Sequence, residues 1–313
     1  MREERDANTS ERRRASDHRV GHLLIIGGGE DRKRDKAILT RFVELAGGRD
    51  SKIVVLTAAS RVQDEMFRMY DRAFADLGVD DCVHMAVTSR EEASDPKRAE
   101  EILSADGVFM TGGDQKRLLA IIGGTQVDAA MHRVIKTRGA CIAGTSAGAS
   151  AMSEHMLATS SASDGAPGRD ETHLAAGLGF LHRVVIDQHF SERQRLGRLL
   201  GIVAQNPYLL GVGIDENTAL VVESGACLEV VGAGAVTLID GREMRSNFLD
   251  VEEGERMELV NVKLHLLPAG ARYKLQGEPE APEALREALA AVTSVSTMGP
   301  LAFPRSLDRR RAA

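Results

Sequence analysis

The sequence predicts an α/β fold: a mostly parallel sheet flanked by helices and followed by C-terminal antiparallel hairpins. From residue 22 onward, short apolar runs alternate with longer amphipathic segments. Continuously apolar strands separated by helices are typical of a parallel sheet that is covered on both faces. Past residue 210 the apolar runs lie close together, with Gly-rich breaks between them. That spacing indicates strands joined by short turns, as in hairpins.

The elements of the parallel region follow from this alternation. Residues 35–46 and 63–77 each place their apolar side chains on one helical stripe, so both segments are predicted helices. The continuous apolar runs predict buried strands at residues 22–26, 52–57, 81–87, 107–110, 140–143 and 183–186. Such a sheet gathers its functional loops beyond the carboxyl ends of its strands.

The hairpin region is predicted from shorter runs. Strands are expected at residues 218–223, 227–231 and 235–239, because glycines occupy both breaks between them. One further strand is predicted at residues 259–267, where Val260, Val262, Leu264 and Leu266 alternate with polar residues.

The chain is predicted to form one domain with two appendages. Residues 1–20 carry dense charge of both signs and predict a disordered leader. Residues 21–275 are expected to form a single α/β catalytic domain. Residues 276–313 predict a helical or irregular tail, with a weak helix at 283–292. The polar Gly/Pro segment 160–171 suits a flap near the functional site or an inert surface loop.

The overall composition excludes several functional classes. Of 313 residues, 43% are hydrophobic and 27% charged, which is typical of a globular protein. A net charge of −6 argues against a nucleic-acid partner, and no apolar run is long enough to span a membrane. Cys82, Cys141 and Cys227 lie in separate apolar runs, which indicates buried thiols of a reducing cytoplasm. They form no zinc spacing with histidine, so no metal is expected.

The pentapeptide Gly144-Thr145-Ser146-Ala147-Gly148 follows a predicted strand and carries the most informative chemistry. It matches the G-x-S-x-G elbow, in which a serine occupies a strained strand-to-helix turn. A serine hydroxyl is a weak nucleophile at neutral pH, so the motif predicts a general base elsewhere in the chain.

The base is predicted at His189, which stands at the carboxyl end of the strand 183–186. A Ser-His pair needs a carboxylate to orient the imidazole, and Asp215 or Glu216 could supply it. After the strand 107–110, two glycines allow close approach of the backbone. The N–H of Gly113 could therefore join that of Ala147 as an oxyanion hole.

A helix is predicted after His189, with Ser191 as its N-cap and apolar residues on one face. We expect at least one of Arg193, Arg195 and Arg198 to face the pocket and bind a substrate carboxylate. The loop 27–31 is not a full dinucleotide fingerprint, since Arg32 occupies the last glycine position. We interpret it as a tight turn bordering the pocket, and no cofactor is expected.

These motifs together resemble one family, the cyanophycinases, within a group of serine peptidases that also includes aspartyl dipeptidase. Their order and spacing fit the family over roughly residues 22–225. The matching stretches are IIGGGED at 25–31, FMTGGDQKRL at 109–118, AGTSAGASAM at 143–152, IDQHFSERQRLGRL at 186–199 and GVGIDENTA at 211–219.

The resemblance implies a class I glutamine-amidotransferase-like sheet in which serine replaces the cysteine nucleophile. It makes Ser146 the nucleophile, His189 the base and Glu216 the orienting acid, with Asp164 and Asp215 as competing candidates for the acid. It also implies a substrate-binding set, namely Gln115, Asp187, Gln188, Arg193, Arg195 and Arg198.

The implied substrate is cyanophycin, a polyaspartate backbone with arginines linked to its side chains, cleaved to β-Asp-Arg dipeptides by a homodimeric enzyme. Carboxylate and glutamine groups would bind the guanidinium, and arginines the carboxylates. The alternative within the family is an aspartyl or isoaspartyl dipeptidase. From other classes, a glutamine amidotransferase relative or a nucleotide-binding module is also considered. Cys141 stands five residues before the elbow serine, which counts against the former.

Overall fold

The computed structural model describes residues 21–159, 173–252, 254–275 and 281–294. The predicted leader (1–20) and the predicted flap (160–171) lie outside these residues. None of the helices in the described part is long and apolar enough to cross a membrane.

The core of the fold is an eight-stranded sheet with the order β16-β11-β10-β1-β5-β4-β2-β3. Strands β1, β5, β4, β2 and β3 are parallel, whereas β10, β11 and β16 join the edge beside β1 in antiparallel fashion. The predicted fold class, a mostly parallel sheet with antiparallel strands from the C-terminal half, is confirmed. The strands are β1 (His22–Ile26), β2 (Lys52–Leu56), β3 (Asp81–Met85), β4 (Gly107–Met110), β5 (Cys141–Thr145), β10 (Thr218–Glu223), β11 (Cys227–Gly232) and β16 (Arg272–Lys274).

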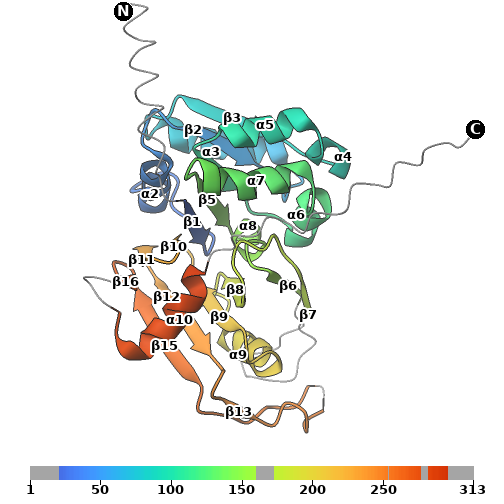
Figure 1. The fold of residues 1–313 in the computed structure, drawn as a ribbon, viewed down its shortest axis with the longest axis vertical. Coiled ribbons are helices and arrows are strands. Elements are labelled where there is room, and N and C mark those ends of the chain that lie inside the picture. The colour runs from blue at the N-terminus through green and yellow to red at the C-terminus, as the bar shows by residue number, and fades with distance from the viewer. Residues whose placement is uncertain (1–20, 160–172, 253, 276–280, 295–313) are drawn as a thin grey trace, which may run out of the picture.

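A second sheet of four strands has the order β15-β12-β9-β8 and lies below the parallel strands in Figure 1. Its members are β8 (Val184–Gln188), β9 (Leu210–Ile214), β12 (Ala235–Asp240) and β15 (Lys263–Pro268). The sequence predicts a strand at 183–186 but not its membership of a separate sheet. Two small ribbons complete the strands: β6 (His155–Thr159) with β7 (His173–Ala176), and β13 (Arg245–Ser246) with β14 (Leu259–Val260).

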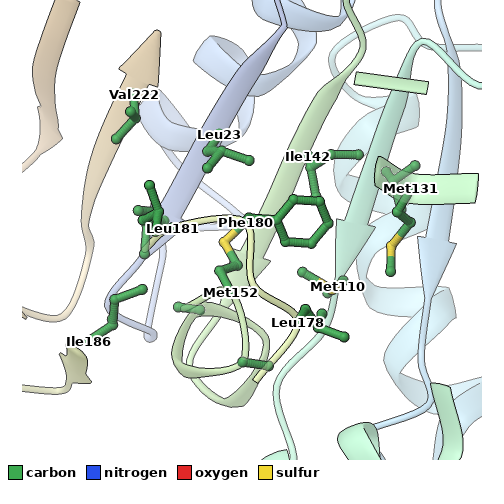
Figure 2. Packing of buried hydrophobic residues seen from close by; sticks show 14 of the residues in the cluster. Leu23, Met110, Met131, Ile142, Met152, Leu178, Phe180, Leu181, Ile186 and Val222 are labelled. Atoms are coloured by element: carbon green, nitrogen blue, oxygen red, sulfur yellow. The ribbon is translucent and has the colours of Figure 1, made fainter. Parts of the chain in front are cut away.

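Helices cover both faces of the large sheet because the side chains of a strand point alternately to opposite faces. Leu24 and Ile26 of β1 pack with helices α2 (Ala37–Ala46) and α3 (Gln63–Ala75). Leu23 and Ile25 point to the other face, where Phe180 packs near Ile142 as Figure 2 shows. The remaining helices are α4 (Arg90–Ala93), α5 (Pro96–Ser104), α6 (Gln115–Ile122), α7 (Gln126–Thr137), α8 (Ala147–Ser150), α9 (Leu196–Gln205) and α10 (Glu283–Thr293).

The prediction of a single strand at residues 259–267 is wrong. The segment divides into β14 and β15, because Asn261 adopts a left-handed conformation with φ 64°. In β15 the alternation also has the opposite sense: Leu264 and Leu266 are 50% and 62% exposed, whereas Leu267 is 3% exposed. A break of this kind shifts the register, which exchanges the two faces of a strand.

Helix α10 lies in the region predicted as a tail, yet its apolar residues belong to the main hydrophobic core. Leu285, Leu289 and Val292 are buried in the same cluster as Leu228 of β11. The helix therefore contributes to the stability of the sheet it covers.

Replacing Leu289 with alanine should lower the free energy of unfolding by about 2–5 kcal/mol, because the side chain is 1% exposed and its loss leaves a cavity. Urea denaturation measures this difference. The matched control is Leu266→Ala, whose side chain is 62% exposed and whose effect should stay within about 0.5 kcal/mol. Equal losses in both variants would contradict the packing of α10 on the core.

Candidate active site

The site lies where the carboxyl ends of strands from the two sheets meet. The end of β1 and the loop after it connect them, because consecutive carbonyl groups there accept hydrogen bonds from three distant segments. Ser146 N–H donates to the Ile26 carbonyl at 3.0 Å, His189 N–H to the Gly27 carbonyl at 2.8 Å, and Asn217 N–H to the Gly28 carbonyl at 2.8 Å. The backbone alone therefore brings the predicted serine, histidine and acidic segments together.

Ser146 occupies the sharp turn between β5 and α8, with φ 52° and ψ −110°. This strained conformation is the one expected of a nucleophile elbow. The flanking glycines are required by space: a Cβ on Gly144 would lie 2.5 Å from the Gly148 carbonyl oxygen, and one on Gly148 would lie 2.6 Å from that of Met110.

The three side chains form a continuous hydrogen-bonded chain. Ser146 Oγ lies 3.0 Å from His189 Nε2, and His189 Nδ1 lies 2.5 Å from Glu216 Oε1. In the arrangement that this geometry favours, the imidazole donates its Nδ1 proton to the carboxylate, and its Nε2 accepts from the serine hydroxyl. The chain of contacts can thus remove the hydroxyl proton as the oxygen attacks a carbonyl carbon.

Geometry distinguishes between the two acidic residues that the sequence leaves open. Asp215 points away from the imidazole: its Oδ1 accepts from Ser191 N (3.1 Å) and Oγ (2.5 Å), and its Oδ2 from Ala235 N (3.0 Å). Glu216 contacts His189, and its own N–H donates to Glu192 Oε2 at 3.1 Å. The sequence motifs do not indicate this hydrogen bond between Glu216 and Glu192. Asp164 lies outside the described residues.

The contact between Ser191 and Asp215 corrects one local prediction. Helix α9 begins at Leu196, with Arg195 at its N-cap position, so Ser191 does not cap it. The residues between them form turns, and the hydroxyl of Ser191 instead joins the β8 loop to the β9 loop.

Two backbone N–H groups near the serine are free to bind an oxyanion. Gly113 has φ 147°, and a Cβ there would lie 2.3 Å from the Ala59 carbonyl oxygen, so only glycine fits. Ala147 begins helix α8, where the first N–H groups have no intrahelical partner. Within the described ranges, neither N–H donates a hydrogen bond. Gly112 lies against the predicted nucleophile, since a Cβ there would be 3.4 Å from Ser146 Cβ.

The glycine loop after β1 borders the site, as expected, and touches the triad directly. A Cβ on Gly28 would lie 2.4 Å from His189 Cε1, and one on Gly29 would lie 2.9 Å from Glu216 Oε2. The glycines thus permit the close approach of the loop to both side chains.

A cavity of about 250 Å³ lies beside the triad segments. Five of the six predicted substrate-binding residues line it, and Arg193 does not; the side chain of Arg193 is exposed. Ser150, Leu157 and Ala158 complete the wall, which includes Gln115, Asp187, Gln188, Arg195 and Arg198.

The side chains of this cavity carry more positive than negative charge. Asp187 is 1% exposed, and its carboxylate accepts hydrogen bonds from Arg195 Nη1 at 3.2 Å and Arg198 Nε at 2.9 Å, with a further one from Arg198 Nη2. Two guanidinium groups therefore share one carboxylate and leave a net positive charge. Gln188 Oε1 is buried without a partner in the described part of the chain, so the cavity also offers an acceptor.

The nearby thiol does not compete as a nucleophile. Cys141 is fully buried at the start of β5, and burial raises the pKa of its thiol far above the ordinary value. A protonated buried thiol is unreactive.

Gly28→Ala should slow the reaction of Ser146 with a fluorophosphonate probe about 10-fold or more, because the added methyl group displaces the imidazole. Gly48→Ala is a matched control: Gly28 and Gly48 have φ 97° and 92°, but nothing lies within 4 Å of a Cβ on Gly48. Backbone strain is therefore similar in the two variants. Labelling followed by mass spectrometry measures the rate, and equal slowing in both would contradict the contact argument.

Comparison with known proteins places the chain in a family. The model of peptidase family S51 matches residues 23–230. A cyanophycinase of Synechococcus elongatus is 39% identical over 257 residues, which cover 82% of this chain and 80% of the relative. A cyanophycinase of Geminocystis herdmanii is 37% identical over 252 residues, covering 80% and 92%. The crystal structure of a peptidase from an acI-B1 actinobacterium has the same fold, with a TM-score of 0.57, 22% identity and coverage of 82% and 97%. The chain therefore belongs to peptidase family S51 and is a serine-type peptidase.

Proposed function

We propose that the chain is a cyanophycinase: a serine exopeptidase that hydrolyses cyanophycin to β-Asp-Arg dipeptides through an acyl-enzyme. The observation that carries the proposal is the Ser146–His189–Glu216 chain of contacts next to a cavity with excess positive charge. The names of the relatives described above support the choice of substrate.

In the proposed reaction, Ser146 Oγ attacks a backbone carbonyl carbon of the polymer and its proton passes to His189 Nε2. Glu216 stabilises the imidazolium that results. The N–H groups of Gly113 and Ala147 hold the oxyanion. His189 then protonates the leaving amine, so the C–N bond breaks and an ester to Ser146 remains. A water molecule, deprotonated by His189, hydrolyses this ester and restores the hydroxyl.

Substrate recognition is proposed to rest on the arginine pair. Arg195 and Arg198 bind carboxylate groups of the substrate, because a guanidinium presents several N–H donors in a rigid plane. Asp187 holds both arginines in place. Its oxygens already accept from them, so the direct contact between Asp187 and a substrate guanidinium, expected from the sequence, is not favoured.

The remaining members of the substrate set have separate proposed roles. The side-chain oxygen of Gln188, buried and unpaired in the described ranges, accepts from the substrate guanidinium. Gln115 is oriented by donation from its Nε2 to the Leu157 carbonyl at 3.1 Å and contributes to the same wall. Arg193 is exposed and is proposed to contact polymer outside the cavity. We further propose that the protein acts as a cytoplasmic homodimer.

Ser146→Ala should release no β-Asp-Arg from purified cyanophycin, with turnover lowered by at least about 10³-fold, because the acyl-enzyme cannot form. Chromatography of the soluble products measures this. Ser104→Ala, which changes an exposed hydroxyl far from the site, should retain normal turnover.

The same assay separates the proposal from the dipeptidase alternative. Asp-X and isoaspartyl dipeptides are supplied to the unmodified protein at matched concentration. Faster hydrolysis of these dipeptides than of polymer would overturn the choice of substrate, whereas substantial product from Ser146→Ala would overturn the nucleophile.

Arg198→Gln should raise the KM for cyanophycin about 10- to 100-fold, because it removes a charge-assisted contact to the substrate carboxylate. The kcat should change less, since the triad does not contact this residue. Steady-state kinetics give both parameters, and Arg133→Gln, an exposed change on α7, is the control. An unchanged KM would show that the arginine pair does not bind substrate.

A further inference from the structure

Glu30 is a buried charge that the reaction described above does not use. It follows the glycines of the β1 loop, and the residue is only 3% exposed. A buried carboxylate is destabilising unless it is hydrogen-bonded or paired. Its contacts therefore indicate what it does in the fold.

Both oxygens of Glu30 accept hydrogen bonds from other elements. Oε2 accepts from Thr145 Oγ1 at 2.7 Å, and Oε1 accepts from the hydroxyl of Tyr70 on α3. Arg32 Nη1 lies 3.3 Å from Oε1 and supplies the compensating charge. Burial and the neighbouring Glu30 carboxylate raise the pKa of Tyr70 well above its ordinary value, so the phenol stays protonated and donates.

Thr145 is the last residue of β5 and immediately precedes the nucleophile. Its side chain is enclosed, since the residue is 3% exposed. The bond to Glu30 thus ties the end of the serine strand to the β1 loop. The carbonyl groups that accept from the backbone N–H groups of Ser146, His189 and Asn217 lie at the end of β1 and in that loop.

We propose that Glu30 is a positioning residue: its buried carboxylate locks the β1 loop to the end of β5 and so sets Ser146 against His189. The inference rests on the proposed role of Ser146 as nucleophile. It concerns a residue that touches neither substrate nor reacting atoms and acts through the loop and through Thr145.

The chemistry of the contacts favours glutamate at this position. A carboxylate offers two acceptors, one for each hydroxyl, whereas the amide of glutamine offers one acceptor and one donor. In Glu30→Gln, the hydroxyl of either Thr145 or Tyr70 would therefore face an N–H group and would have to turn and accept from it instead of donating, and the charge opposite Arg32 would be lost. The side chain keeps its volume, so the variant tests the contacts with little change in packing.

Glu30→Gln should lower kcat about 10- to 100-fold while KM stays within about threefold, because small misplacement of reacting groups slows the chemistry. The rate of fluorophosphonate labelling of Ser146 should fall in parallel with kcat. Both are measured well below the melting temperature, so a purely structural role would leave the rate of the folded protein unchanged. Glu44→Gln, at an exposed glutamate paired with Arg41 on α2, is the matched control and should behave as the unmodified protein.

Two further variants keep the test decisive if Glu30→Gln does not fold. Thr145→Val and Tyr70→Phe each remove one hydroxyl that donates to Glu30 and retain the shape of the side chain. Thr145→Val should reproduce the loss of kcat, and Tyr70→Phe should give a smaller one.

The double variant Glu30→Gln/Thr145→Val should lose no more kcat than the more strongly affected of its two single variants, because both changes break the same contact.

The outcomes separate this inference from the proposed function. Normal kcat and normal labelling in Glu30→Gln, or in Thr145→Val where the former does not fold, would overturn the positioning role. Absence of labelling at Ser146 in the unmodified protein would instead overturn the nucleophile assignment.

Discussion

The active site depends on a row of backbone carbonyl groups at the end of β1. Ile26, Gly27 and Gly28 accept hydrogen bonds from segments that are more than a hundred residues away in sequence. Each of those segments carries, or immediately follows, one member of the triad. Backbone bonds of this kind resist displacement because a buried N–H without a partner is strongly unfavourable. The main chain therefore already sets the relative positions of the segments that carry Ser146, His189 and Glu216.

Three non-glycine residues with positive φ also lie in this place. Ser146, His189 and Asn217 all have positive φ, at 52°, 48° and 47°. Each such conformation costs roughly 1–3 kcal/mol and persists only where the surrounding structure enforces it. The end of β1 and the loop after it supply that enforcement, since they hydrogen-bond to the backbone of all three residues. With these conformations, Ser146 Oγ and His189 Nε2 lie 3.0 Å apart.

The charged groups are divided into two functional sets. Glu216 is hydrogen-bonded to the imidazole of His189, while Asp187 is hydrogen-bonded to Arg195 and Arg198. Because Asp187 is buried, its charge fixes the direction of both guanidinium groups. The cavity then offers positive charge in a defined geometry beside the triad. Under the proposed function, this separation allows substrate binding to be altered at the arginines without changing Ser146.

Much of the fold and of the triad could be predicted from local sequence. Hydrophobic periodicity located the strands, and small residues around Ser146 predicted the elbow, because both signals depend on neighbouring residues only. The family resemblance named Glu216 as the acid, whereas the residues alone left Asp215 open, and the tertiary structure places Glu216 against His189. Only the tertiary structure decided that the Asp187 carboxylate is already occupied and that Glu30 is buried. Each of these three features depends on hydrogen-bond partners from distant segments. Residue type and spacing do not specify which of several carboxylates a distant donor will reach.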